Sequence, residues 1–201
     1  MRTLVLGLAL ACVATAPGWT QTAAATTAPG AAPKRVPTRK EITMSLTLAS
    51  PAFKQLGGIP KRHTCDGADL SPPLAWSGVP PGTKSLALVV DDPDAPDPAA
   101  PKVVWVHWVL YDLPASATSL AEGTTAKTLP PGTREGLNDW KQPGWRGPCP
   151  PIGRHRYFHK LYALGIVLPD LHHPTRPTLE KAMAGHVLAQ AELVGTYQRT
   201  R

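Results

Sequence analysis

The stretch LALVVDDPDAP, residues 86–96, carries the strongest fold signal in this sequence of 201 residues. Its first five residues are apolar, and a run of this length suits a buried strand better than a helix. Two aspartates and then prolines follow, and since proline cannot donate to a strand ladder, we expect the strand to end at Val90. The adjacent carboxylates of Asp91, Asp92 and Asp94 repel one another unless cations or hydrogen-bond donors meet them. The stretch therefore predicts a buried strand that leads into a polar site.

Segments on both sides of this stretch also have the character of strands. Residues 42–48 alternate apolar and polar side chains, as a half-buried strand does. Residues 103–110 and 155–168 are rich in aromatic and aliphatic side chains, and residues 189–197 alternate again. The 24 prolines and 17 glycines favour turns between short strands. We therefore predict a mainly β protein, an antiparallel β-sandwich with long proline-rich loops.

One short helix is expected near the C-terminal end. Thr178 could cap a helix from Leu179 to Ala184, and Gly185 would end it. A continuous helix over residues 179–194 is the alternative. Residues 112–153 are predicted to be mostly loop, and a loop this long inside a compact domain is usually functional.

The first 24 residues have the features of a secretory signal peptide. Arg2 precedes the apolar run Leu4–Ala14, and small residues follow. This run is too short to span a bilayer as a stable anchor, so we expect no transmembrane segment. A lipoprotein attached through Cys12 is the alternative, but Ala9 stands where such proteins usually have a large apolar residue. The prediction is a periplasmic or secreted protein with a signal peptide over residues 1–24.

Residues 25–40 are predicted to be a disordered linker, because they lack apolar periodicity and are rich in Ala, Thr and Pro. Residues 41–201 would then form the folded domain. The formal charge is +7, but the first forty residues hold five basic and no acidic side chains. Sixteen basic and fourteen acidic side chains remain in the domain. A nearly neutral domain lacks the electrostatic footprint of a nucleic-acid-binding protein.

If Cys12 leaves with the leader, Cys65 and Cys149 remain. An even number of cysteines in an oxidising compartment permits one disulfide. Two separate buried thiols are the alternative, because the sequence does not show whether the two Cα atoms come within bonding range.

A second polar segment, His155-Arg156-Tyr157, opens the predicted strand 155–168. Because side chains alternate across a strand, His155 and Tyr157 share one face and Arg156 lies on the other. Arg156 can grip Asp94 in a bidentate pair, and this pair would act as a structural clamp between the two polar segments.

A lone imidazole, His107, lies among the apolar residues of the segment 103–110. We expect Asp92, His107, His155 and Tyr157 to form one site. Gly147 would allow a ligand to approach closely and would offer its backbone N–H.

These motifs together resemble the signature of the phosphatidylethanolamine-binding protein family. The resemblance rests on four segments, in chain order Asp92-Pro93-Asp94-Ala95-Pro96, Trp105-Val106-His107-Trp108, Gly147-Pro148 and His155-Arg156-Tyr157. Shorter stretches, such as Cys65-Asp66-Gly67 and Lys160-Leu161-Tyr162-Ala163-Leu164, are similar to the bacterial YbhB/YbcL-type members, which are Raf-kinase-inhibitor-like. The similarity covers about residues 44–199.

The resemblance implies a central antiparallel β-sandwich and a pocket that accepts phosphate-like or carboxylate groups. Carried over residue by residue, the pocket consists of Asp92, His107, Gly147, Pro148, His155 and Tyr157. Two departures stand out. Eukaryotic members commonly have a second histidine where Val106 stands, and their C-terminal helix beside the pocket has no counterpart here, which would leave the rim more open. Nothing in the sequence carries over kinase inhibition.

We therefore expect an exported protein that binds a small anion, such as phosphate or a phosphorylated headgroup, without a cofactor, a metal or catalytic residues. Phosphate affinity should fall as the pH rises above the histidine pKa. An exported inhibitor that docks a protein partner through the pocket rim is one alternative. A weak hydrolase is another, with His155 as general base and His107 as oxyanion donor. Two histidines and an aspartate could also bind zinc.

The remaining histidines and the tryptophans receive simpler predictions. Three histidines are expected at the surface, namely His159, His172 and His173. Three tryptophans are expected in the core, namely Trp76, Trp105 and Trp108. Trp140 and Trp145, in the long loop, could belong to the core or to the site.

Overall fold

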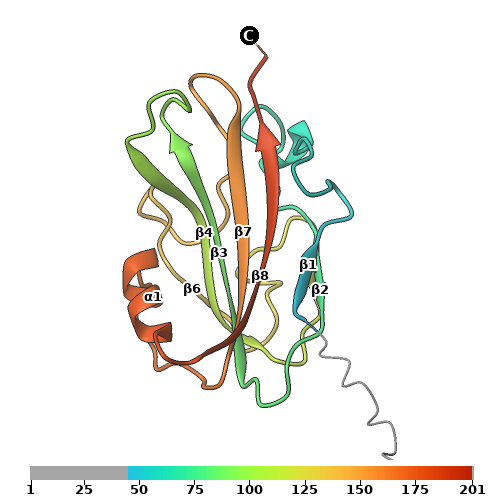
Figure 1. Ribbon diagram of the computed structural model, residues 1–201, viewed down its shortest axis with the longest axis vertical. Helices are drawn as coiled ribbons and strands as arrows, with labels where there is room; N and C mark the ends of the chain where they lie inside the picture. Colours follow the sequence, from blue (N-terminus) through green and yellow to red (C-terminus); the bar gives the residue numbers. More distant parts are fainter. Residues whose placement is uncertain (1–44, 201) are drawn as a thin grey trace, which may run out of the picture. The chain divides into compact units, whose positions relative to one another are not determined.

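The computed structural model describes residues 45–200, and two antiparallel sheets make up their framework (Figure 1). The predicted signal peptide and linker lie outside the described residues. The smaller sheet consists, in spatial order, of β1 (Thr47–Ala49), β2 (Leu74–Ser77) and β5 (Ser119–Leu120). The larger sheet consists, in spatial order, of β6 (Arg134–Glu135), β4 (Val103–Pro114), β3 (Ser85–Ala95), β7 (His155–Leu164) and β8 (Val187–Tyr197). A 3-10 helix (Lys61–His63) and α1 (Arg176–Met183) complete the described elements.

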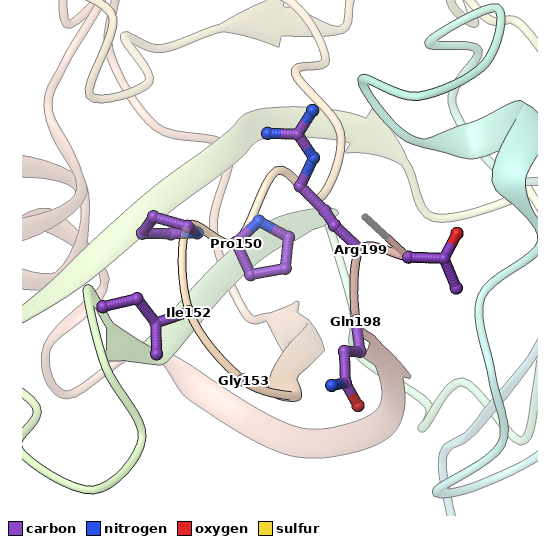
Figure 2. A pocket seen from close by; sticks show the side chains of 7 residues that line it. Pro150, Ile152, Gly153, Gln198 and Arg199 are labelled. Carbon is purple, nitrogen blue, oxygen red and sulfur yellow. The ribbon is translucent and has the colours of Figure 1, made fainter.

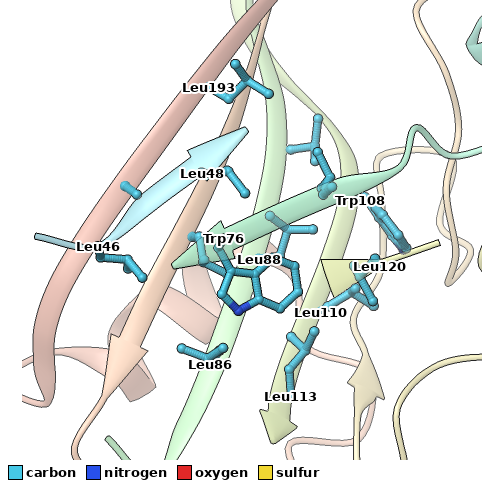
Figure 3. Close-up of a cluster of buried hydrophobic side chains, with 14 of the residues drawn as sticks. Leu46, Leu48, Trp76, Leu86, Leu88, Trp108, Leu110, Leu113, Leu120 and Leu193 are labelled. Carbon is cyan, nitrogen blue, oxygen red and sulfur yellow. The ribbon is translucent and has the colours of Figure 1, made fainter. Parts of the chain in front are cut away.

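Side chains from both sheets meet in one hydrophobic cluster (Figure 3). Leu86 and Leu88 of β3 are fully buried there, and Leu48 and Trp76 of the smaller sheet belong to the same cluster. The predicted mainly β, sandwich-like class is confirmed. Among the described residues no helix has the length and hydropathy that spanning a membrane would require.

The opposite face of the larger sheet is covered by α1 (Figure 1). Leu179 and Met183, one helical turn apart, are buried against Ala87 and Val89 of β3. Both faces of β3 are therefore buried, which is why its apolar run is continuous rather than alternating.

The predicted end of this strand at Val90 is wrong, because β3 continues to Ala95. Its pairing with β4 shifts register between Val90 and Asp91 and again between Asp92 and Ala95. Pro93 lies inside the second irregularity, where a missing N–H removes no regular ladder bond. The strand therefore carries the acidic residues into the sheet instead of stopping before them.

The predicted helix exists, but its start and its capping residue are different. Thr175 rather than Thr178 occupies the N-cap position, and Pro177 lies in the first turn, where proline is tolerated. The helix ends at Met183, and Gly185 follows with a φ of 79°, a conformation that suits glycine. The alternative of a continuous helix over residues 179–194 is wrong, because β8 begins at Val187.

Residues between β4 and β7 are mostly loop, interrupted by β5 and β6. A disulfide joins Cys149 of this loop to Cys65, with 5.4 Å between the Cα atoms. The backbone N–H of Cys65 also donates to the carbonyl of Pro148 at 3.1 Å. These contacts hold the last part of the loop, shortly before β7 begins, against the segment that follows the 3-10 helix.

Candidate functional site

Three neighbouring strands of the larger sheet bring the predicted polar side chains together. Asp92 lies near the end of β3, His107 near the start of β4, and His155 with Tyr157 at the start of β7. Because β3 is antiparallel to both neighbours, its end and their starts meet at the same edge of the sheet. All four side chains are buried.

These four residues line one cavity of about 240 Å³. Trp105 and Trp140 form an aromatic part of its wall, and the indole of Trp140 lies edge-on to the His107 ring at a centroid distance of 5.3 Å. Prolines of two loops complete the wall, namely Pro96, Pro150 and Pro151. The cavity is therefore largely apolar, with a few converging polar groups, as small-ligand sites usually are.

Asp92 and His155 form a buried hydrogen-bonded pair. Asp92 Oδ2 lies 2.7 Å from His155 Nδ1, and Asp92 Oδ1 accepts the backbone N–H of Asp94 at 2.8 Å. His155 Nε2 lies 2.9 Å from the carbonyl oxygen of Ile152, which can only accept, so Nε2 carries a proton. Burial raises the pKa of Asp92, and the hydrogen bond with His155 opposes this rise. The imidazole and the carboxylate are thus each held in place by the other and by a neighbouring backbone group.

His107 is held as one neutral tautomer. Its Nδ1 lies 2.5 Å from the carbonyl oxygen of Arg146, so Nδ1 is the donor and Nε2 carries the lone pair. Burial lowers the pKa of His107 to about 4. Burial therefore favours the neutral imidazole of His107.

Two polar atoms of the site have no hydrogen-bond partner among residues 45–200, although both are buried. They are His107 Nε2 and the Tyr157 hydroxyl oxygen. The two rings lie edge to face with centroids 5.2 Å apart, and burial raises the pKa of the Tyr157 hydroxyl. Buried polar groups are normally paired, so these two atoms are the natural contact points for a ligand.

Arg156 lies on the opposite face of β7 from this cavity, and its side chain is 52% exposed. Its Nε donates to Asp94 Oδ2 at 2.9 Å and its Nη2 to Asp94 Oδ1 at 2.7 Å. The Arg156 backbone N–H also donates to Oδ2 at 2.9 Å. These Arg156 hydrogen bonds lower the pKa of Asp94. The bidentate pair links the end of β3 to the start of β7, directly behind the Asp92–His155 pair.

Gly147 and Pro148 lie outside the wall of the cavity. The Gly147 N–H, expected to serve a ligand, instead donates to Asp69 Oδ1 at 2.7 Å. A Cβ atom at Gly147 would lie 2.3 Å from the carbonyl oxygen of His63, so this glycine permits close approach of another chain segment rather than of a ligand. Together with the disulfide, these contacts position the loop that supplies Pro150 and Pro151.

The roles considered for a hydrolase do not fit this geometry. Both ring nitrogens of His155 are engaged, by Asp92 and by the Ile152 carbonyl, so neither is free to act as a general base. His107 Nε2 is an acceptor and cannot donate to an oxyanion. Within residues 45–200 no group of three or more His, Cys, Asp or Glu side chains is arranged to hold a metal ion.

A larger cavity of about 550 Å³ is lined by the loop 150–153 and by the residues that follow β8 (Figure 2). Gln198 and Arg199 line it opposite Ile152. Arg199 already pairs with Asp66 at 2.9 Å, and none of the unpartnered buried polar atoms belongs to its lining residues. The smaller cavity is therefore the better candidate site.

Several aromatic residues differ from their predicted places. His159, expected at the surface, is fully buried between Phe53 and Trp145, with ring centroids 5.4 and 6.1 Å away. His159 lies two residues after Tyr157 in β7, so both side chains share the buried face of the strand, and this alternation indicates burial of His159. Trp105, expected in the core, is half-buried and lines the cavity. Two further tryptophans are buried as expected, Trp76 and Trp108, and two histidines are exposed as expected, His172 and His173.

The sequence signal missed the loop residues that close the site. The sequence does not decide whether Trp140 belongs to the core or to the site, and it assigns neither Pro150 nor Pro151 to the pocket wall. Their place depends on how the long loop folds back over the sheet, and proline-rich composition alone does not specify this.

Comparison with known proteins agrees with this fold. The model of the family described as phosphatidylethanolamine-binding protein matches residues 49–198. A UPF0098 protein of Methanothermobacter thermautotrophicus is 48% identical over 155 residues, which cover 77% of this chain and 99% of that protein. A UPF0098 protein of Chlamydia pneumoniae is 44% identical over 155 residues, which cover 77% of this chain and 100% of that protein.

Two solved structures are also similar. A phosphatidylethanolamine-binding protein homologue from Chlamydia trachomatis has a TM-score of 0.72 and 41% identity, over 78% of this chain and 99% of that chain. YbcL of E. coli, described as a member of the mammalian family, has a TM-score of 0.70 and 31% identity over the same shares. On the strength of the matching family model and these relatives, the chain belongs to the phosphatidylethanolamine-binding protein family.

Proposed function

We propose that this protein is a binding protein that holds a small phosphate- or carboxylate-type anion in the cavity between β3, β4 and β7. The observation that carries this proposal is the pair of unpartnered buried polar atoms, His107 Nε2 and the Tyr157 hydroxyl, in a cavity with mostly apolar walls. A small polar ligand would satisfy both atoms while the aromatic walls exclude water.

In this proposal the Tyr157 hydroxyl donates a hydrogen bond to an anionic oxygen. Asp92 would repel an anion if its carboxylate were free, but Oδ2 faces His155 Nδ1 at 2.7 Å and Oδ1 accepts the N–H of Asp94 at 2.8 Å, so the protein engages both oxygens. The cavity thus accepts a small anion without a buried cation opposite it. Its volume of about 240 Å³ suits a single phosphate or carboxylate group with a short substituent.

Calorimetric titration of the purified protein with inorganic phosphate and with acetate tests the proposal. A hydrogen bond to a charged group contributes about 1.5–3 kcal/mol, so Tyr157→Phe should weaken binding roughly tenfold or more. His172→Gln, at an exposed position outside the cavity, is the matched control and should bind as the wild type does. Absence of binding by the wild type, or equal affinity in Tyr157→Phe, would count against the proposal.

Export completes the proposal, because the N-terminal signal-like sequence and the Cys65–Cys149 disulfide both suit an oxidising compartment. Cell fractionation, followed by mass spectrometry of the N-terminus, tests this. Recovery of the uncleaved chain in the cytoplasm would argue against export.

A second candidate function is docking of a protein partner on the rim of the cavity. Four large apolar side chains are exposed within or next to the lining segments, namely Val103 (50%), Val104 (45%), Trp140 (37%) and Ile152 (52%). Clustered apolar exposure of this kind marks interaction surfaces. If the rim is the functional surface, Trp140→Ser should abolish partner binding while His155→Ala weakens only anion binding.

A further inference from the structure

We propose that the protein has a second ligand site, a cavity beside β6 that binds a small organic dication of the class of short aliphatic diamines. We call it the Glu135 cavity, and its lining comes from residues 69–71, 123–126, 135 and 143–145. It shares no lining residue with the cavity between β3, β4 and β7, so this inference does not depend on the proposed anion binding.

The Glu135 cavity has room for a small ligand. Its volume is about 370 Å³, and a neighbouring cavity of about 320 Å³ shares two of its lining residues, Ala126 and Glu135. Glu135 therefore lies where the two cavities adjoin. Apolar side chains form part of the wall, namely Leu70, Pro143 and Trp145. These surfaces suit a methylene chain, whereas the polar ends of a ligand need partners of their own.

Two of the lining residues are carboxylates without a basic partner. Among the buried and half-buried carboxylates of residues 45–200, three form no ion pair, namely Asp69, Asp97 and Glu135. Asp97 accepts the N–H of Ala99 at 2.9 Å in an exposed turn. The other two line the same cavity, which therefore holds two negative charges without a fixed counter-charge.

Buried N–H groups favour the ionised form of both acids. Burial raises the pKa of Asp69 and of Glu135. The Gly147 N–H and the Trp145 indole oppose this rise in the pKa of Asp69, and the Trp108 indole opposes it in the pKa of Glu135. Trp108 is only 1% exposed, and neither indole nitrogen has a hydrogen-bond partner within residues 45–200. These indoles are thus directed at the two carboxylates without pairing with them.

The carboxylate oxygens remain available to a ligand. Asp69 Oδ1 accepts the N–H of Gly147 at 2.7 Å, and its Oδ2 accepts no hydrogen bond from the described residues. The Glu135 carboxylate accepts none from those residues either, although the Glu135 backbone carbonyl lies 3.0 Å from His173 Nδ1. Since polar groups away from bulk water are normally paired, these oxygens are natural contacts for an N–H donor of a ligand.

Basic side chains of the neighbouring segments do not neutralise this cavity. Arg134 forms an ion pair with Asp170, and the Arg146 guanidinium donates to Gln142 at 3.4 Å. A cationic ligand would therefore not compete with a cation of the described chain for these two carboxylates.

An aliphatic diamine complements these features. Each ammonium group carries a positive charge and N–H donors, whereas an ionised carboxylate only accepts. Two ammonium groups can therefore serve the two carboxylates, and the chain between them can lie on the apolar wall. A metal ion fits less well, since within residues 45–200 no group of three or more His, Cys, Asp or Glu side chains is arranged to hold one, and Ca²⁺ takes about six to eight oxygen ligands.

Calorimetric titration of the purified, disulfide-bonded protein at pH 7.5 and low salt tests the inference with three probes of similar size. Putrescine has an ammonium group at each end of its chain, butylamine has one ammonium group, and butanediol has none. A hydrogen bond to a charged group contributes about 1.5–3 kcal/mol, so putrescine should bind roughly tenfold more tightly than butylamine. Butanediol should bind more weakly still.

Absence of putrescine binding would overturn the inference. Binding of butylamine or butanediol within threefold of putrescine would overturn it as well, because the second charge, or any charge, would then be irrelevant. These outcomes come from the wild-type protein, so they do not depend on whether a variant folds.

A variant pair adds a test at the carboxylate concerned. Glu135→Gln keeps the shape of the side chain and removes its charge, so it should weaken putrescine binding roughly tenfold. Glu192→Gln, the same change at an exposed position that lines neither of the adjoining cavities, is the matched control and should bind as the wild type does. Equal putrescine affinity of the two folded variants would refute the role of the Glu135 carboxylate.

Discussion

Replacing both Cys65 and Cys149 by serine would remove the covalent link between the long loop and the segment after the 3-10 helix. The disulfide spans 84 residues of sequence, so it restricts a large part of the unfolded chain. In the chain-entropy model, a loop of this length corresponds to about 4.5 kcal/mol at 25 °C. Domains of this size are stable by roughly 5–15 kcal/mol, so the double variant should lose a large share of its stability.

Urea denaturation, followed by tryptophan fluorescence, measures this loss. With a slope of about 2 kcal/mol per molar urea, the midpoint should fall by roughly 2 M. Wild-type protein reduced with a dithiol should unfold at the same midpoint as the oxidised double variant, because both lack the same link. Each single variant, Cys65→Ser or Cys149→Ser, should match the double variant when measured under reducing conditions.

A loss below about 1 kcal/mol would refute the reasoning, because it would mean that the link does not restrict the unfolded chain as the model requires.

The folded double variant also tests whether the disulfide is needed for the binding site. In the folded variant two hydrogen bonds of this loop should persist, from the Gly147 N–H to Asp69 and from the backbone N–H of residue 65 to the Pro148 carbonyl. We therefore expect the folded variant to retain phosphate binding, and complete loss of binding would show that the disulfide itself holds the cavity wall.

Three further predictions concern stability. Burial lowers the pKa of His159 to about 4, so below its unfolded pKa of about 6.5 the unfolded state binds the extra proton. His159 should therefore lower the free energy of unfolding by up to about 1.4 kcal/mol per pH unit as the pH drops from 6.5 to 4. His107 has the same shift and contributes its own slope, so His159→Phe should make the slope shallower without abolishing it in urea titrations at pH 7, 5.5 and 4.5, and an unchanged slope would contradict this role of His159. Arg156→Lys, which cannot form the bidentate pair with Asp94, should lower the free energy of unfolding by about 1 kcal/mol, and an unchanged midpoint would contradict the clamp. Gly147→Ala should cost about 1–3 kcal/mol in thermal or urea unfolding, because the added Cβ collides with the carbonyl of His63, and a neutral substitution would show that this contact relaxes freely.

Much of the fold follows from local patterns. The continuous apolar run 86–90 predicted a buried strand, and the structure buries both of its faces, one against α1 and the other in the cluster shared with the smaller sheet. Alternation in His155-Arg156-Tyr157 placed Arg156 on the face opposite the other two side chains, as the burial pattern of β7 shows. The predicted ends of elements were less accurate. The helix is capped by Thr175 rather than Thr178, and β3 continues past Val90 to Ala95. Helix caps and β-bulges depend on a few local hydrogen bonds, which the spacing of apolar residues does not specify.

Only part of the candidate site could be predicted from the sequence. Residues close in sequence, or on one strand face, could be grouped from the pattern alone. Loop residues such as Trp140 and Pro151 could not, because their place over the sheet depends on contacts made by distant segments. The predicted surface position of His159 is wrong, because the contacts that bury its imidazole come from Phe53 and Trp145, which are distant in the sequence or in another segment.

By itself, the sequence determined that this protein is built from short antiparallel strands and which polar side chains it concentrates at the ends of three of them. Only the tertiary structure decided what those side chains can do. The Arg146 carbonyl accepts a hydrogen bond from His107 Nδ1, which leaves His107 Nε2 as an acceptor. The Ile152 carbonyl accepts from His155 Nε2, and Asp69 Oδ1 accepts from the Gly147 N–H. The physical reason is that side-chain periodicity encodes which face a residue occupies, whereas the donor or acceptor role of each polar atom is set by backbone groups that only folding brings within hydrogen-bond distance.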